Sequence, residues 1–147
     1  FIGMLLVGEP GSGKTTLLRS IARELVRQQK ILSVIDERRE LFAGNTQGEA
    51  LDVLAGLPKG QAVQMALRTL SPQVILVDEL GGLDEVTALE QGLFSGVDFV
   101  ATLHAATPEE ATMRPQVKYL MERGAVRVLV WLTGRQAPGC IGEVRFL

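Results

Sequence analysis

A glycine-rich stretch near the start of the chain has the residue types and spacing of a phosphate-binding loop. Its sequence, GEPGSGKTT, matches the Walker A pattern G-x-x-x-x-G-K-[ST]. Glycines permit backbone angles and a close approach that side chains would block, so that successive N–H groups can face phosphate oxygens. The alternative is a chance glycine-rich turn. We predict that a nucleoside triphosphate binds the nine residues Gly8, Glu9, Pro10, Gly11, Ser12, Gly13, Lys14, Thr15 and Thr16.

Two residues of this loop carry side-chain chemistry. We expect Lys14 to reach the β and γ phosphates and the Thr15 hydroxyl to ligate Mg²⁺. A helix that begins near Lys14 would add its positive end to the site. The chain has no N-K-x-D sequence of the kind that reads guanine, which favours ATP over GTP.

A separate segment supplies the pair of adjacent carboxylates that the glycine-rich loop lacks. VILVDE has four apolar residues followed by Asp78 and Glu79. We expect Asp78 to hold the Mg²⁺ and Glu79, at the carboxyl edge of the sheet, to activate a water for hydrolysis. The alternative is that Glu79 only caps the following turn.

Two further strand ends carry polar residues. VDFVATLH ends on His104, the single histidine, which is either a structural hydrogen-bonding residue or a phosphate sensor. IDERRE places charged residues 36–40 after another strand, either as a solvated loop or as a switch whose charges meet phosphate or a neighbouring subunit.

The pattern of the whole chain predicts a mainly parallel α/β sheet flanked by helices, with a pair of strands at the C-terminus. Apolar runs predict strands at residues 1–7, 31–36, 73–79, 97–104, 126–131 and 141–146. Helical spacing predicts helices at 15–29, 61–70 and 83–94, and one that starts at Thr107 and is interrupted by Pro115. Residues 43–60 are expected to form a loop with one turn of helix at most.

Composition sets the class of protein. The 147 residues are 46% hydrophobic with a net charge of −2, which fits one globular domain over residues 1–147 without a global attraction to nucleic acid. Cys140 is the single cysteine, so no internal disulfide can form. The apolar runs are shorter than the roughly 20 residues that a membrane span needs. Because the chain opens on Phe1 within an apolar run, we expect it to be a fragment of a longer protein.

Five segments in order, LVGEPGSGKTTLLRSIAR, VIDERRE, DVLAGLPKG, LSPQVILVDELG and GVDFVATLHA, resemble the ATPase domain of the stage III sporulation protein AA family over nearly the whole chain. That family is similar to the motor ATPases of type II and type IV secretion and of pilus retraction. Their Walker A loop, acidic box, Walker B segment and histidine box correspond here to residues 8–16, 36–40, 74–79 and 101–105.

The resemblance implies a RecA-like P-loop ATPase that uses ATP and Mg²⁺ and forms a hexamer when complete. It implies a place at the cytoplasmic face of a membrane, on the mother-cell side, with the subunits of a membrane-bound export complex as partners. It also implies an N-terminal domain that this chain lacks. In the family topology the histidine strand lies between the two Walker strands, which makes His104 a catalytic candidate beside the γ-phosphate, with Lys14 and Glu79.

The sequence departs from the family where an intersubunit arginine is expected. Glu49 and Ala50 stand before DVLAGLPKG, and Arg39 replaces a small polar residue. We expect Arg38 and Arg39 to act across a subunit boundary if they act at all.

Two other functions compete with the motor ATPase. Arg19, Arg23 and Arg27 lie one helical turn apart, as on a solvated helix face or on a surface that docks an acidic partner or single-stranded nucleic acid. A small-molecule kinase would need an arginine-rich lid and an acceptor pocket, and the sequence indicates neither.

Overall fold

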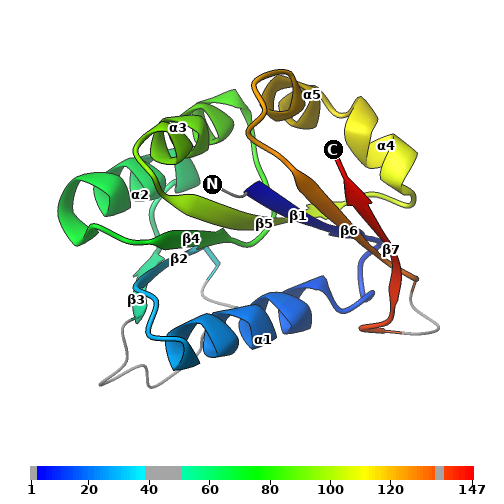
Figure 1. Cartoon of the computed structure of the whole chain (residues 1–147), viewed down its shortest axis with the longest axis horizontal. Helices are drawn as coiled ribbons and strands as arrows, with labels where there is room; N and C mark the ends of the chain where they lie inside the picture. The colour runs from blue at the N-terminus through cyan, green and yellow to red at the C-terminus, as the bar shows by residue number, and fades with distance from the viewer. Residues whose placement is uncertain (1–2, 39–50, 135–137) are drawn as a thin grey trace.

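The computed structural model describes residues 3–38, 51–134 and 138–147, and within these ranges seven strands form one sheet with helices on both faces (Figure 1). The strands are β1 (Gly3–Gly8), β2 (Leu32–Asp36), β3 (Leu51–Ala55), β4 (Val74–Val77), β5 (Asp98–His104), β6 (Val128–Leu132) and β7 (Ile141–Phe146). The helices are α1 (Lys14–Arg27), α2 (Lys59–Met65) continued by a π-helical turn η1 (Ala66–Leu70), α3 (Leu83–Phe94), α4 (Pro108–Met113) and α5 (Pro115–Glu122). The predicted α/β class is confirmed.

The order of the strands brings distant parts of the sequence to one edge of the sheet. The order is β3-β2-β4-β5-β1-β6-β7. All neighbours are parallel except β6 and β7, the predicted C-terminal pair, which are antiparallel. β5 lies between β1 and β4, with Gly8 opposite His104 and Val77 opposite Ala101. The carboxyl ends of β1, β4 and β5 therefore meet, as the family topology implied.

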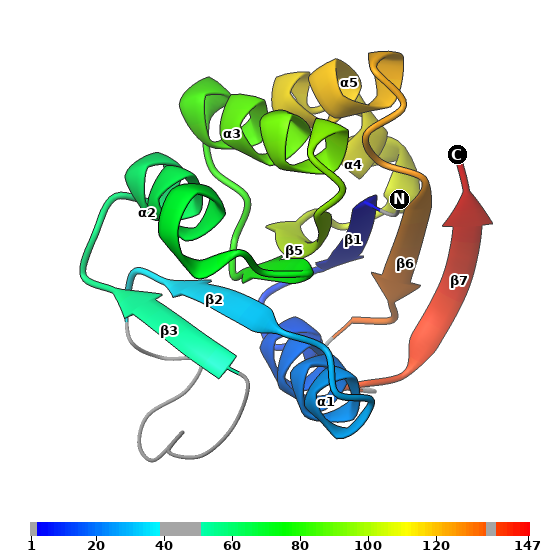
Figure 2. The ribbon, with the colours of Figure 1, turned by 60° about the vertical axis from the view of Figure 1, so that its left-hand side comes forward.

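Each face of the sheet has its own apolar core. Figures 1 and 2 show α1 on one face and α2, α3, α4 and α5 on the other. Leu18 and Ala22 of α1 are buried in the core on the first face, and Leu89 of α3 and Leu120 of α5 in the core on the second. Such burial contributes about 1.5–3 kcal/mol for each large apolar side chain. Strands β1, β2, β4 and β5 are buried on both faces because helices cover both.

The helix that the sequence predicted after Thr107 is divided in two. Thr107 is the N-cap of α4, and its Oγ1 accepts a hydrogen bond from the Glu110 N–H at 3.1 Å. The Glu110 carboxylate reaches back to the N–H of Ala106, at 2.8 Å. Pro115 has no N–H to donate, and Arg114 is extended with ψ 134°, so α5 starts as a new helix.

The predicted loop at residues 43–60 is wrong where the structure describes it. Residues 51–55 form β3, a parallel edge strand that pairs with β2 over five positions. Its side chains alternate between the faces: Val53 packs against the α1 core and Leu54 against the opposite core. The exposed edge of β2 supplies the partner, so five residues of weak strand pattern become a strand through tertiary context.

Helix α2 also starts earlier than predicted, at Lys59 directly after Pro58. Its continuation η1 ends at Leu70, before Ser71, which adopts a left-handed conformation with φ 46°.

The two apolar runs at residues 1–8 and 128–134 contribute strands β1 and β6. Across the residues that the structure describes, no helix is both long and apolar enough to cross a bilayer.

Candidate nucleotide site

The glycine-rich loop, Gly8–Thr16, joins the end of β1 to the start of α1. Gly11 and Gly13 have φ 82° and 96°, in the left-handed region that glycine adopts without a steric penalty. An α-helix leaves the N–H groups of its first turn without intrahelical acceptors, so those of Lys14, Thr15 and Thr16 point into the site. This arrangement suits an anion such as a phosphate group.

Lys14 lies within the loop rather than in solvent. Its Nζ donates hydrogen bonds to the carbonyl oxygens of Gly8 and Glu9, both at 2.9 Å, and the side chain is buried. Burial lowers the pKa of the Lys14 ammonium from its usual 10.5, while Asp78 and Glu79 act in the opposite direction. The loop therefore holds a cation beside the N–H groups that face the site.

Thr15 and Asp78 lie opposite each other across the end of the sheet. The Thr15 Oγ1 is 3.4 and 3.5 Å from the two carboxylate oxygens of Asp78. Thr102 Oγ1 donates to Asp78 Oδ1 at 2.9 Å and so fixes the carboxylate. A hydroxyl and a carboxylate are oxygen ligands of the kind that Mg²⁺ prefers, so this pair fits the metal of a magnesium nucleotide.

Glu79 directly follows Asp78 and adopts an unusual backbone conformation. Its φ is 63°, a left-handed value that is uncommon for a residue with a side chain. The Glu79 N–H donates to Thr102 Oγ1 at 2.6 Å, and Lys59 Nζ donates to the Glu79 carbonyl oxygen. The carboxylate lies 3.8 Å from Arg38 Nη1 and 3.9 Å from His104 Nε2.

His104 ends β5 beside the loop. It lines a cavity of about 290 Å³ together with Gly11, Gly13, Lys14, Thr15, Thr16 and Pro138. Burial and the nearby Lys14 charge lower the pKa of His104 below 6.5, and Glu79 and Asp78 oppose this shift. The imidazole is therefore neutral at pH 7 and can accept or donate a hydrogen bond.

The structure thus brings Lys14, Thr15, Asp78, Glu79 and His104 to one edge of the sheet, although they come from three separate segments. The Arg38 guanidinium lies beside Glu79 of the same chain, because β2 and β4 are adjacent and end side by side. Its expected role across a subunit boundary stays a prediction. Arg39, Glu40, Glu49 and Ala50 lie outside the described residues.

Three contributions to this site did not follow from the sequence. Lys59 belongs to no spacing pattern with the loop and comes into contact only because α2 starts beside the end of β4. The Thr102 hydroxyl bridges Asp78 and Glu79. The turn after β6 approaches the loop, with the Gly139 N–H donating to the Ser12 carbonyl at 2.8 Å.

The close approach of this turn gives Gly13 a second reason to be glycine. A Cβ at position 13 would lie 2.6 Å from the Gly139 nitrogen, which is too close for any side chain. Pro138 of the same turn lines the cavity of the loop. Pro138 and Gly139, which lie between β6 and β7, therefore border the candidate site.

Two of the three arginines of α1 lie on its solvent-exposed surface. Arg23 and Arg27 are exposed, and Arg27 pairs with Glu24 of the same helix at 2.7 Å. The contact is an ordinary ion pair between neighbouring turns on a solvated helix surface.

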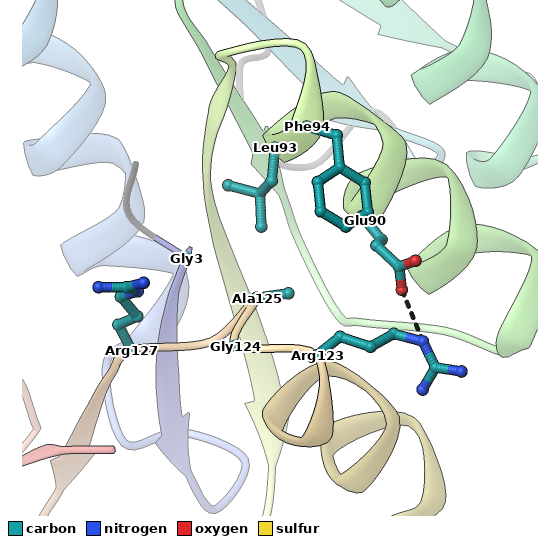
Figure 3. Close-up of a pocket in the computed structure, with 8 residues that line it drawn as sticks. All are labelled: Gly3, Glu90, Leu93, Phe94, Arg123, Gly124, Ala125 and Arg127. Atoms are coloured by element: carbon teal, nitrogen blue, oxygen red, sulfur yellow. Dashed lines mark ion pairs between the residues drawn. The ribbon is translucent and has the colours of Figure 1, made fainter.

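A second cavity lies at the opposite edge of the sheet, where β1 begins. It has a volume of about 220 Å³ and is lined by residues of β1, α3 and the α5–β6 connection (Figure 3). Leu93 and Phe94 border it, and an ion pair of 3.0 Å joins Arg123 Nε to Glu90 Oε2. This cavity lies at the far end of β1 from the glycine-rich loop, so it plays no part in the candidate nucleotide site.

Comparison with known proteins identifies the family. The sequence model described as "Sporulation stage III, protein AA" matches residues 2–145. The chain belongs to the stage III sporulation protein AA family. It is 32% identical to "Stage III sporulation protein AA" of Bacillus subtilis (strain 168) over 155 aligned residues, which cover 98% of this chain and 50% of that protein. The chain thus spans half the length of this relative. It spans 18% of the length of "Protein SEEDLING PLASTID DEVELOPMENT 1" of Arabidopsis thaliana, to which it is 28% identical over 80% of this chain.

Solved structures support the fold assigned to this member of the family. The VirB11 ATPase of the Brucella suis type IV secretion system, in complex with sulphate, aligns with a TM-score of 0.73 and 23% identity, over 99% of this chain and 50% of that one. The Legionella pneumophila ATPase DotB aligns with a TM-score of 0.67 and 24% identity, over 88% of this chain and 40% of that one. The family member described here therefore has the fold of these ATPase domains.

Proposed function

We propose that this chain is a magnesium-dependent ATPase that drives a secretion-like export complex during sporulation. The observation that carries the proposal is the convergence of four groups at one sheet edge: the Lys14 ammonium, the Thr15 hydroxyl and the carboxylates of Asp78 and Glu79. Family membership and the similarity to secretion ATPases support the same reaction class.

Each residue has a distinct task in this proposal. The glycine-rich loop, residues 8–16, binds the phosphates through its N–H groups, and Lys14 binds the β and γ phosphates. Thr15 and Asp78 would hold Mg²⁺, which when bound would neutralise charge on the phosphate oxygens. Glu79 accepts a proton from the attacking water.

His104 takes the role of a neutral hydrogen-bonding partner near the γ-phosphate. It lies close to both Lys14 and Glu79, so it can respond to the state of the site without adding a second positive charge. We propose that it links the presence of the γ-phosphate to the position of β5.

The wider biological assignments belong to the same proposal. We infer that the protein works as a hexamer at the cytoplasmic face of a membrane, on the mother-cell side, with the subunits of a membrane-bound export complex as partners. This part rests on the family alone.

Two variants test the proposal by separating binding from hydrolysis. Lys14→Ala is expected to abolish ATP binding in calorimetry, because it removes the side-chain charge that meets the β and γ phosphates. Glu79→Gln is expected to keep Mg-ATP bound while hydrolysis is lost, because the amide preserves the shape of the side chain and cannot act as a base.

Arg23→Ala, on the exposed side of α1, serves as the matched control for loss of one charge. Unchanged nucleotide affinity in Lys14→Ala would refute the assignment of the loop. Hydrolysis at the wild-type rate in Glu79→Gln would refute the assignment of the base.

A further inference from the structure

Lys59 is the first residue of α2 and has no role in the function proposed above, yet its side chain contacts the candidate base. Its Nζ donates a hydrogen bond to the backbone carbonyl oxygen of Glu79. We propose that Lys59 is a positioning residue, which holds the peptide of Glu79 in the conformation that aims the carboxylate into the nucleotide site. The inference rests on the proposed function, because it takes Glu79 as the base.

The conformation of Glu79 is one that needs outside support. Among the described residues other than glycine, Gln29, Ser71 and Glu79 have positive φ. Gln29 and Ser71 follow helix ends, where a left-handed residue is common. Glu79 follows a buried strand instead, and a side-chain-bearing residue stays in this region only when its surroundings hold it there.

The hydrogen bonds around Glu79 come from two elements. The hydroxyl of Thr102, in β5, accepts a hydrogen bond from the Glu79 N–H at 2.6 Å. The backbone carbonyl oxygen of Thr102 accepts a second one from the Leu80 N–H at 2.7 Å. Lys59 of α2 supplies the donor for the Glu79 carbonyl oxygen. The peptide group before the Glu79 Cα is therefore held by β5, and the peptide group after it by both β5 and α2.

The position of Lys59 is itself well determined. Helices α2 and α3 approach closely at its neighbour, since a Cβ on Gly60 would lie 3.1 Å from Asp84 Oδ2. Glu85, buried in the first turn of α3, accepts from the Gly81 N–H at 2.9 Å and so holds the same loop two residues later. The Lys59 charge also acts on the Glu85 carboxylate and favours its ionised form.

The charges around Lys59 keep the ammonium at this place. It lines a small polar cavity of about 30 Å³ with Arg38 and with four acidic residues, Asp36, Glu37, Asp78 and Glu79. A cation is stabilised by an excess of nearby carboxylates, and a shift of α2 would separate it from them.

Loss of this contact should affect hydrolysis through geometry. Without the ammonium, the Glu79 carbonyl oxygen loses the hydrogen-bond donor that α2 supplies, and only the contacts to Thr102 hold this segment. We expect the Glu79 backbone to shift and its carboxylate to move away from the water that it must activate. A misplacement of about 1 Å at a reacting group lowers the rate by about 10²-fold. ATP binding, which depends on the glycine-rich loop, should be retained.

The test compares four variants of the full-length protein: Lys59→Met, Glu79→Gln, the double variant Lys59→Met/Glu79→Gln, and Lys118→Met. Methionine keeps the unbranched stem and removes the charge, and Lys118 is an exposed lysine of α5 that serves as the matched control. For each we would measure single-turnover ATP hydrolysis, ATP affinity by calorimetry and the thermal unfolding midpoint.

We expect Lys59→Met to lose about 10²-fold in hydrolysis, with ATP affinity within about twofold of the wild type and Lys118→Met unchanged. Adding Lys59→Met to Glu79→Gln should cause no further loss, because a residue that acts through Glu79 has nothing left to position.

Three results would overturn the inference: wild-type hydrolysis in Lys59→Met, a further loss in the double variant, or unfolding or lost ATP affinity in Lys59→Met, which would make Lys59 a general structural residue. Failure of the proposed function looks different, since Glu79→Gln would then hydrolyse ATP like the wild type. In that case the inference about Lys59 would fail with it.

Discussion

Thr102 and Asp78 lie 24 residues apart in the sequence, and the hydroxyl of the first donates a hydrogen bond of 2.9 Å to the carboxylate of the second. The same oxygen accepts from the N–H of Glu79, so one buried hydroxyl of β5 orients both acidic residues at the end of β4. The geometry of the candidate site therefore depends on the neighbouring strand.

Replacing Thr102 by valine tests this dependence. Thr102→Val keeps the shape of the side chain but leaves the Glu79 N–H without its acceptor, so we expect a loss of about 1–3 kcal/mol in the free energy of unfolding. Chemical denaturation measures it. Thr69→Val, at an exposed threonine that donates to a carbonyl of its own helix, is the control and should change stability far less. Equal effects at the two positions would argue against a special role for the Thr102 hydroxyl.

The titration of His104 can be followed without assignment because the chain has one histidine. Burial and Lys14 disfavour the imidazolium, so we expect the NMR titration midpoint of the imidazole below 6.5. Lys14→Ala should raise the midpoint and Glu79→Gln should lower it further, because these charges act in opposite directions. Between the lowered pKa and 6.5 the unfolded chain binds more protons, so this group makes stability fall as the pH falls through that range. A midpoint above 6.5 would contradict the environment described for His104.

Glu85 gives a pH dependence of the opposite sign. Burial raises the pKa of its carboxyl from 4.5 to about 7, with Lys59 and the Gly81 N–H opposing the shift. The folded state therefore binds the proton more tightly than the unfolded state. The stability from this group is complete below pH 4.5 and is lost as the pH rises through about 7.

Glu85→Gln removes this titration while keeping an acceptor for Gly81. We expect the variant to be more stable than the wild type at pH 8, by up to about 3 kcal/mol, and similar to it at pH 4. Thermal unfolding across this pH range measures the difference. Glu122→Gln, at an exposed residue of α5, is the control. A constant difference between Glu85→Gln and the wild type at every pH would refute the assignment.

Hydrolysis by this chain alone should be slow and should depend on assembly. An arginine supplied by a neighbouring subunit typically raises the rate of hydrolysis by about 10³ to 10⁵. Within this chain, Arg38 lies next to the candidate base, with its Nη1 3.8 Å from Glu79 Oε2, so we expect the arginine that meets the γ-phosphate to come from another subunit. We expect ATP to bind normally, and specific activity to rise with protein concentration and with restoration of the segments that the longer relatives carry. Steady-state assays combined with light scattering measure this. Fast hydrolysis that stays constant over about a hundredfold dilution of a monomer would show a site complete in one chain.

The sequence alone determined the features that depend on local order. The stretch GEPGSGKTT, between an apolar run and a helical pattern, predicts the glycine-rich loop. Its glycines, Lys14 and Thr15 are close together in the sequence, so their joint role does not depend on distant parts of the chain. VILVDE likewise predicts a buried strand that delivers Asp78 and Glu79 to its carboxyl end. The alternation of predicted strands and helices was sufficient to predict the α/β fold class, which the structure confirms.

Only the tertiary structure decided which distant residues support those segments. Thr102, Lys59 and Arg38 reach Glu79 because β5 and β2 flank β4 and because α2 begins beside its end, and neither spacing nor periodicity records such contacts. Strand β3 formed at a place without a strong strand pattern, since the free edge of β2 supplied its hydrogen-bond partners. Local propensity acts over a few residues, whereas a parallel sheet joins residues that are tens of positions apart, so the order of the strands sets the surroundings of the site.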